Sequence, residues 1–321
     1  MIMNPTAIKH VVVDGHSLTL ESFVAIARYN ATVELAPSAL EAMQKSRALA
    51  EKIAAEGRVA YGITTGFGEF QKVAVPKEMS NQLSTNLILS HCTAAGEPYA
   101  DEIVRGMMLL RANALCGGVS GVRPLLVEML LEMLNKGVTP IVPQKGSLGS
   151  SGDLAPLAHM TLPMLGKGEA MYEGVKMTGA EAMAKAGIAT LDTLVSKEGL
   201  GMTNGTCAMT SVGALALYDS ICAAQLGDVI ASLSMEGLTG LRNAFDPASI
   251  RCAARRVRCS SPRICASCSP APRSWTTASP TACRTLMPCA ASRSCTAPAV
   301  TRSSTSVRRS RSSSTPSPTT R

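Results

Sequence analysis

This sequence lacks the segments that would place a protein in a membrane or outside the cell. The first ten residues have no basic region followed by an apolar stretch, so no secretory signal is predicted. We also find no uninterrupted apolar run of membrane-spanning length. Both absences predict a cytoplasmic protein with no membrane partner.

Metal-binding and nucleotide-binding patterns are missing as well. Four of the eleven cysteines lie in residues 1–250, and none of the four has the spacing of a zinc site. We expect them to be reduced, buried thiols and expect no metal. No Gly-Lys-Ser/Thr follows the Gly/Ser-rich loop at residues 146–152, which disfavours a P-loop. The four cysteines are Cys92, Cys116, Cys207 and Cys222.

Residues 251–321 contain no acidic residue, no glycine and no lysine. Thirteen of the chain's 31 basic residues lie there, all of them arginine, together with seven of the eleven cysteines. The other 250 residues hold 18 basic and 23 acidic side chains, a charge of −5. The net charge of +8 therefore belongs to this tail and predicts no nucleic-acid partner for the body of the chain.

The tail composition is typical of a GC-rich gene translated out of frame. Back-translation of residues 282–289, with each codon started on the third base of the previous one, permits Leu-Gln-Asp-Ala-Tyr-Ala-Leu-Arg. We predict a frame slip close to Ile250. The alternative is a genuine Arg/Ser-rich tail that binds RNA, with Arg308-Arg-Ser-Arg-Ser312 as its core. In either case the tail has few large apolar groups to bury and is expected to be disordered.

Helical patterns dominate residues 1–250. A short strand closed by an Asp-Gly turn is predicted at residues 10–15. Ser38 and Glu41 predict a capping box for a helix that Gly57 ends. The fold class is therefore mainly α, with a little β near the N-terminus and before Gly152. Further helices are predicted over residues 101–115, 124–134 and 211–235.

The Gly/Ser-rich loop ends in Ser150-Ser151-Gly152, a sequence that can become a cofactor. Because glycine has no Cβ, the amide nitrogen of Gly152 can reach the carbonyl carbon of Ser150 and close a ring. Dehydration of Ser151 then gives an imidazolone with an exocyclic methylene, an electrophile that no standard side chain supplies. The alternative is an ordinary Gly/Ser turn.

The stretch from Gly146 to Met160 resembles the signature of the aromatic amino acid ammonia-lyases. Three further segments resemble the same family in the same order, so the resemblance covers roughly residues 8–250. They are Tyr61-Gly-Ile-Thr-Thr-Gly-Phe-Gly68, similar to the family's tyrosine loop, Asn86-Leu-Ile-Leu-Ser-His91, similar to its substrate-pocket helix, and Lys197 to Thr206, similar to its asparagine segment.

The resemblance implies a cofactor that the chain makes itself. This is 4-methylidene-imidazol-5-one (MIO), formed from Ser150, Ser151 and Gly152 without an external cofactor. The resemblance also implies that Tyr61 is the base that removes the β-proton, from a loop able to close over a pocket. Asn204 is implied to bind the substrate carboxylate or the ring oxygen, since its amide donates two hydrogen bonds. The alternatives are a packing tyrosine and an Asn-Gly turn.

His91 bears on the substrate. Imidazole can hydrogen-bond a polar ring, whereas phenylalanine-type lyases resemble each other in having an apolar residue here. The implied reaction is loss of ammonia from L-histidine to give trans-urocanate. A tyrosine ammonia-lyase or aminomutase, and an inactive fragment with an RNA-binding tail, are the alternatives. Two departures from the family are Ser150, where alanine is usual, and Thr203, where the usual neighbour is apolar.

The resemblance also implies an organisation in three parts. Residues 1–200 form the MIO-forming domain, residues 201–250 begin a central helical bundle, and residues 251–321 are the out-of-frame tail. In the family each active site is built from several subunits of a homotetramer, and later helices supply part of it. Those helices are missing as written, so the chain in this form is expected to be incomplete and inactive.

Overall fold

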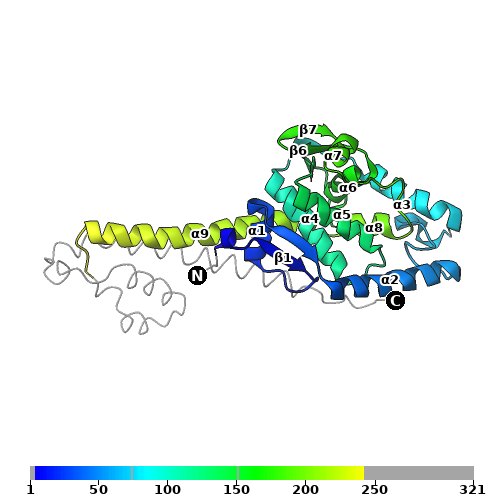
Figure 1. Ribbon diagram of the computed structural model, residues 1–321, viewed down its shortest axis with the longest axis horizontal. Helices are drawn as coiled ribbons and strands as arrows, with labels where there is room; N and C mark the ends of the chain where they lie inside the picture. The colour runs from blue at the N-terminus through cyan, green and yellow to red at the C-terminus, as the bar shows by residue number, and fades with distance from the viewer. Residues whose placement is uncertain (1–3, 74, 150–151, 242–321) are drawn as a thin grey trace, which may run out of the picture. The chain divides into compact units, whose positions relative to one another are not determined.

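The computed structural model describes residues 4–73, 75–149 and 152–241, and the fold is mainly helical (Figure 1). The predicted fold class is therefore confirmed. Ser150, Ser151 and the tail at residues 251–321 lie outside the described residues, as do the predictions made for their structure. The chain divides into two compact units, residues 1–215 and 216–321. The candidate site lies in the first.

The core of the first unit is built on three helices. Helix α4 packs against α1 on one side and α5 on the other. Both longer helices were predicted, and α5 ends as expected where Gly137 takes a left-handed φ of 75°. The bounds are α1 (Leu20–Tyr29), α4 (Asp101–Cys116) and α5 (Pro124–Lys136). Their fully buried side chains include Ile26, Met107, Met108, Leu115, Leu126 and Leu130.

Helix α2 (Pro37–Ala55) begins differently from the prediction. The capping box is wrong, because the N-cap is Ala36 and no side chain caps the helix. Pro37 occupies the first helical position, where its fixed φ and missing N–H favour a start. Ser38 therefore lies inside the first turn. The predicted end is confirmed, since Gly57 follows the helix with a φ of +64°.

A small parallel sheet lies near the N-terminus, and it confirms the predicted strand. Strand β1 (His10–Val13) pairs with β2 (Thr32–Leu35), and His10 lies opposite Thr32. The two strands run parallel because α1 crosses between them. The predicted Asp-Gly turn follows β1, and Gly15 takes a φ of +90°.

The carboxylate of Asp14 organises this turn. Its Oδ1 accepts the N–H groups of Ser17 and His16, both at 2.8 Å. These hydrogen bonds lower the pKa of Asp14 from 3.8 to about 2. A carboxyl with a lowered pKa stabilises the fold above its unfolded pKa, and this contribution is lost as the pH falls through the folded pKa.

We therefore expect the Asp14→Ala variant to unfold more easily than the unchanged chain above a pH of about 4. The difference in free energy of unfolding should narrow between a pH of about 4 and about 2. Urea denaturation at a series of pH values measures it. A difference that does not change with pH would contradict the assignment.

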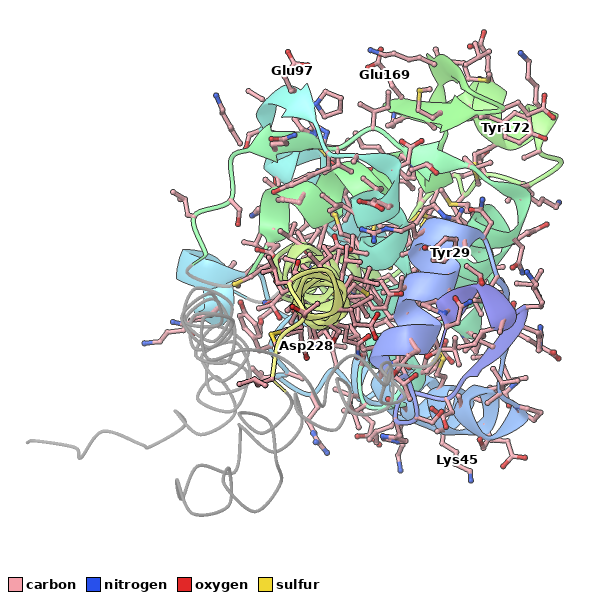
Figure 2. All side chains as sticks on the ribbon, turned by 90° about the vertical axis from the view of Figure 1, so that its left-hand side faces the viewer. Tyr29, Lys45, Glu97, Glu169, Tyr172 and Asp228 are labelled. Atoms are coloured by element: carbon pink, nitrogen blue, oxygen red, sulfur yellow. The ribbon has the colours of Figure 1, made fainter. Side chains whose placement is uncertain are left out.

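Two antiparallel sheets complete the strands of the first unit. One pairs β3 with β5, and the other has the order β4-β6-β7. Figure 2 shows Glu97, Glu169 and Tyr172, from these sheets, at one edge of the molecule and Lys45 of α2 at the opposite edge. The bounds are β3 (Ala95–Pro98), β4 (Thr139–Pro140), β5 (Pro143–Lys145), β6 (Glu169–Tyr172) and β7 (Val175–Thr178).

The remaining helices include the ones that carry the candidate site. The helical stretch predicted over residues 211–235 is confirmed as part of α9. The bounds are α3 (Lys77–His91), α6 (Leu154–Thr161), α7 (Gly179–Lys185), α8 (Glu198–Thr203) and α9 (Cys207–Gly237). Short 3₁₀ helices are η1 (Pro5–Ala7), η2 (Gly68–Lys72) and η3 (Leu162–Leu165).

Residues Glu198–Gly237 correct the expectation about apolar runs. This helical segment is long and apolar enough to cross a membrane by length and composition, with a mean hydropathy of 1.4. Asp219 and Asp228 interrupt the apolar residues of this segment, so it is not an uninterrupted apolar run. The 18-residue window that meets the criterion is 22% buried in the structure. A core helix of a soluble protein meets the same criterion, and one such helix is weak evidence for a membrane span.

The four cysteines of the body are free thiols, as expected, but only two are fully buried. Cys116 and Cys207 are buried, whereas Cys92 and Cys222 are half-buried. Burial raises the pKa of Cys92 to about 11 and that of Cys116 to about 12, so both stay protonated near neutrality. Within the described residues, no group of three or more His, Cys, Asp or Glu side chains is placed to hold a metal ion.

Candidate active site

Three packed helices bring the motif-bearing segments together. Helix α3 packs against α6 and α8, and α6 packs against α8 (Figure 1). Glycine permits the close approach of α8 to α3, because a methyl group at Gly199 would overlap the backbone of Ser84. The His91 helix, the helix after Gly152 and the helix before Asn204 thus form one cluster.

The contact between Gly152 and Gly205 lies at the centre of this cluster. Gly152 has a φ of +96°, a conformation that favours glycine. A methyl group at this position would overlap the carbonyl group of Gly205. The N–H of Asp153 donates to the same carbonyl oxygen at 2.6 Å. The structure therefore brings Gly152 next to the segment that carries Asn204.

The side chain of Asp153 makes further hydrogen bonds that hold the loop in place. It is buried and precedes α6, but its carboxylate does not cap that helix. Its Oδ2 instead accepts the N–H of Met209 in α9 at 2.9 Å, and its Oδ1 accepts the hydroxyl of Ser147 at 3.4 Å. The sequence analysis did not assign a role to Asp153. An acidic residue between a Gly/Ser loop and an apolar helix was the signal available.

The tyrosine loop rests on α8. Gly62 lies so close to Leu200 that a methyl group there would be 3.0 Å from its Cδ2. The ring of Tyr61 meets Phe67 edge-on, with centroids 6.2 Å apart. Its hydroxyl oxygen accepts the N–H of Gly68 at 3.4 Å. Tyr61 is 51% exposed, so the described residues do not by themselves provide the water-excluded site that a tyrosine base requires.

His91 and Asn204 lie at the C-terminal ends of two helices in the cluster. His91 ends α3 and is half-buried, and its Nδ1 donates to the carbonyl oxygen of Leu87 at 2.8 Å. A neutral imidazole that donates from Nδ1 accepts a hydrogen bond at Nε2. Asn204 caps α8, and its side chain is exposed. Both predicted substrate contacts can thus be reached by a small molecule.

A cavity of about 580 Å³ lies between α2, the tyrosine loop and the segment before α8. Ile63 and Thr64 line it on the loop side. Tyr61, His91, Gly152 and Asn204 are not among its lining residues, so this cavity is separate from the candidate site. Its lining also includes Arg47, Glu51, Val75, Ser80, Asn81 and Ser196.

An ion pair holds the N-terminal end of α8. Glu198 is fully buried and accepts hydrogen bonds from Nε and Nη2 of Arg123 at 2.6 and 2.8 Å. It also accepts the N–H of Val195 at 2.9 Å. This pairing raises the pKa of Arg123 and keeps its charge in place.

We expect Glu198→Ala to lower the free energy of unfolding by about 3–5 kcal/mol, because it leaves the guanidinium without its partner. The matched control is Glu132→Ala, which removes a half-exposed ion pair with Lys136 at 2.7 Å. That change should cost under about 1 kcal/mol. Denaturation by guanidinium chloride compares the two variants, and equal losses would show that the buried pair does not hold α8.

Comparison with known proteins assigns the chain to a protein family. The family model for aromatic amino acid lyases matches residues 18–258. The chain belongs to the aromatic amino acid lyase family. The resemblance drawn from the four sequence segments is thereby confirmed, and the match extends slightly past the predicted slip at Ile250.

The relatives of this aromatic amino acid lyase include several histidine ammonia-lyases. Those of Alkaliphilus metalliredigens and Caldanaerobacter subterraneus subsp. tengcongensis are each 51% identical over 238 residues. The match covers 74% of this chain and 47% of each relative. The chain therefore spans about half the length of the curated relatives it matches.

Solved structures of the family share the fold. The tyrosine aminomutase of Streptomyces globisporus is 34% identical, with a TM-score of 0.75, and the match covers 80% of this chain and 48% of that one. The histidine ammonia-lyase of Trypanosoma cruzi is 32% identical, with a TM-score of 0.74 over 80% of this chain and 49% of that one. The match thus covers about half of each of these structures.

Proposed function

We propose that this chain is the ring-forming half of a histidine ammonia-lyase, which converts L-histidine to trans-urocanate and ammonia. The observation that carries the proposal is the contact of Gly152, at a φ of +96°, with Gly205 beside Asn204. Relatives at 51% identity that are histidine ammonia-lyases favour histidine as the substrate.

The described residues around position 152 suit the MIO group. The cradle formed by Gly205 excludes any residue with a Cβ, and the bonds of Asp153 hold the backbone just after the triad. Ring closure requires the same freedom from a Cβ and a backbone that is held tightly. MIO made from Ser150, Ser151 and Gly152 supplies an electrophile that turns the substrate amine into a leaving group.

Tyr61 takes the β-proton in this proposal. Its phenol oxygen accepts the N–H of Gly68 at 3.4 Å. Its loop rests on Leu200, four residues before Asn204 in the chain. The loop of the base and the carboxylate contact are thus both attached to the same short helix.

Asn204 and His91 bind the two ends of the substrate. The amide of Asn204 donates hydrogen bonds to the carboxylate or to the ring oxygen. His91 accepts at Nε2, which suits the N–H of an imidazole and also the O–H of a phenol. Histidine and tyrosine both satisfy this contact, and the relatives that are histidine ammonia-lyases support histidine.

The exposure of Tyr61 and Asn204 bears on assembly. A proton removed from carbon requires a site from which water is excluded. We assign the missing cover to later helices and to neighbouring subunits of a homotetramer in the cytoplasm. We also hold that residues 251–321 are an out-of-frame tail, and that the frame-restored protein, with the slip near Ile250 reversed, contains those helices.

The test is a substrate assay on the frame-restored protein. L-histidine should give a product that absorbs in the near ultraviolet together with one ammonia per turnover, and L-tyrosine should give little. Activity on L-tyrosine alone, or formation of a β-amino acid, would replace the proposal by the tyrosine lyase or aminomutase alternative. The similarity in fold to a tyrosine aminomutase is the observation that supports this alternative.

A further inference from the structure

Arg111 is a buried charge to which the proposed reaction gives no role. It lies on the core face of α4, close to Met107 and Met108 in the chain, and is 6% exposed. Burial lowers the pKa of Arg111, which means that the fold keeps a charged group where water cannot solvate it well. An arginine on the apolar face of a helix therefore requires specific partners.

Those partners are at the C-terminal end of α8. Nη1 of Arg111 donates to the carbonyl oxygen of Asn204 at 2.9 Å, and Nη2 donates to that of Gly201. The last carbonyl groups of a helix have no partner within the helix and carry partial negative charge. The guanidinium fork satisfies two of them at once and places a positive charge where the helix dipole favours one.

The chain after α8 passes directly over this guanidinium. A methyl group at Gly205 would overlap Nη1 of Arg111, so the two are in close contact. On its other side, Gly205 accepts the N–H of Asp153 at 2.6 Å and lies against Gly152. Gly205 is therefore in close contact with both Arg111 and Gly152.

We propose that Arg111 is a positioning residue that holds Asn204 and Gly205 in the place from which they press on Gly152 and Asp153. Glycine can adopt many backbone conformations, and the contact with Gly205 limits Gly152 to the one observed. The role of these contacts in ring closure, which would be to compress the loop, depends on the proposed function. The positioning of Asn204 and Gly205 by Arg111 depends only on the contacts described above.

The chain contains a matched control for Arg111. Arg105 lies on the same helix, is also 6% exposed, and also donates to two backbone carbonyls, those of Leu134 at 3.1 Å and Ile26 at 3.0 Å. In both arginines Nε has no hydrogen-bond partner among the described residues. The two arginines differ in the elements they bind. The partners of Arg105 belong to α5 and α1, whereas those of Arg111 lie at the end of α8.

Hydrogen–deuterium exchange on the chain as given tests the proposal. Lysine is a point charge and cannot bridge two carbonyls as the guanidinium fork does. Arg111→Lys should speed exchange of the Asp153 amide by about tenfold, the effect of weakening one hydrogen bond, while Arg105→Lys leaves that amide unchanged. If the Arg111→Lys variant does not fold, exchange of the Asp153 amide is measured in Arg111→Gln instead. Equal effects of the two arginines, or no effect of Arg111 substitution, overturn the proposal.

The intact mass separates failure of this inference from failure of the proposed function. Ring formation removes two molecules of water, so the fraction of chains with that mass deficit reports the ring without any assay of activity. If Arg111→Lys lowers this fraction and Arg105→Lys does not, positioning by Arg111 and ring formation are both supported. If exchange at Asp153 depends on Arg111 but the unchanged chain has its full encoded mass, the positioning stands and the ring chemistry is wrong.

Discussion

Replacement of Ser151 by alanine is expected to abolish the lyase activity of the frame-restored protein. Alanine has no hydroxyl to eliminate, so the exocyclic methylene cannot form and the substrate amine stays a poor leaving group. Loss of the group that performs covalent catalysis lowers kcat by about 10³-fold or more. Urocanate formation from L-histidine measures the effect, and intact mass shows whether the deficit of two waters has gone.

Ser38→Ala is the control for this change. Ser38 is exposed in the first turn of α2 and belongs to no part of the site, so its loss should leave kcat and the mass deficit unchanged. Retention of activity or of the full mass deficit in Ser151→Ala would show that the electrophile is made elsewhere in the chain.

Tyr61→Phe is expected to lower kcat of the frame-restored protein by about 10²–10⁴-fold, the range for loss of a general base. KM should change little, because Asn204 and His91 supply the substrate contacts. The mass deficit should persist, because Tyr61 takes no part in closing the ring. Steady-state kinetics with L-histidine, together with intact mass, separate the two steps.

The matched control is Tyr29→Phe. Tyr29 lies at the end of α1 (Figure 2). It is 45% exposed, close to the 51% of Tyr61. The hydroxyl of Tyr29 has no assigned role, so the variant should leave both kcat and KM unchanged. A Tyr61→Phe variant with undiminished kcat would remove Tyr61 from the mechanism and leave the base unidentified.

Features set by neighbouring residues could be predicted from the sequence. The strand at His10, the end of α5 at Gly137 and the long helix over residues 211–235 all follow from local patterns, and the structure confirms them. The sequence also singled out Gly152, and the φ of +96° found there favours glycine. Ring formation at this loop stays a prediction.

Features set by distant contacts could not be predicted. Asp153 precedes α6 at its N-cap position, but its carboxylate accepts the N–H of Met209, 56 residues further along the chain. Arg111 binds carbonyls 90 and 93 residues away. In such cases the partner is chosen by packing, which no local pattern contains.

The central claim is that this chain makes its own electrophile from Ser150, Ser151 and Gly152. The most direct measurement is the intact mass of the purified protein, with the modification located by fragmentation to residues 147–159. The account predicts a mass lower than the encoded one by two waters, confined to that segment and absent from Ser151→Ala. A segment with its full encoded mass would contradict the claim.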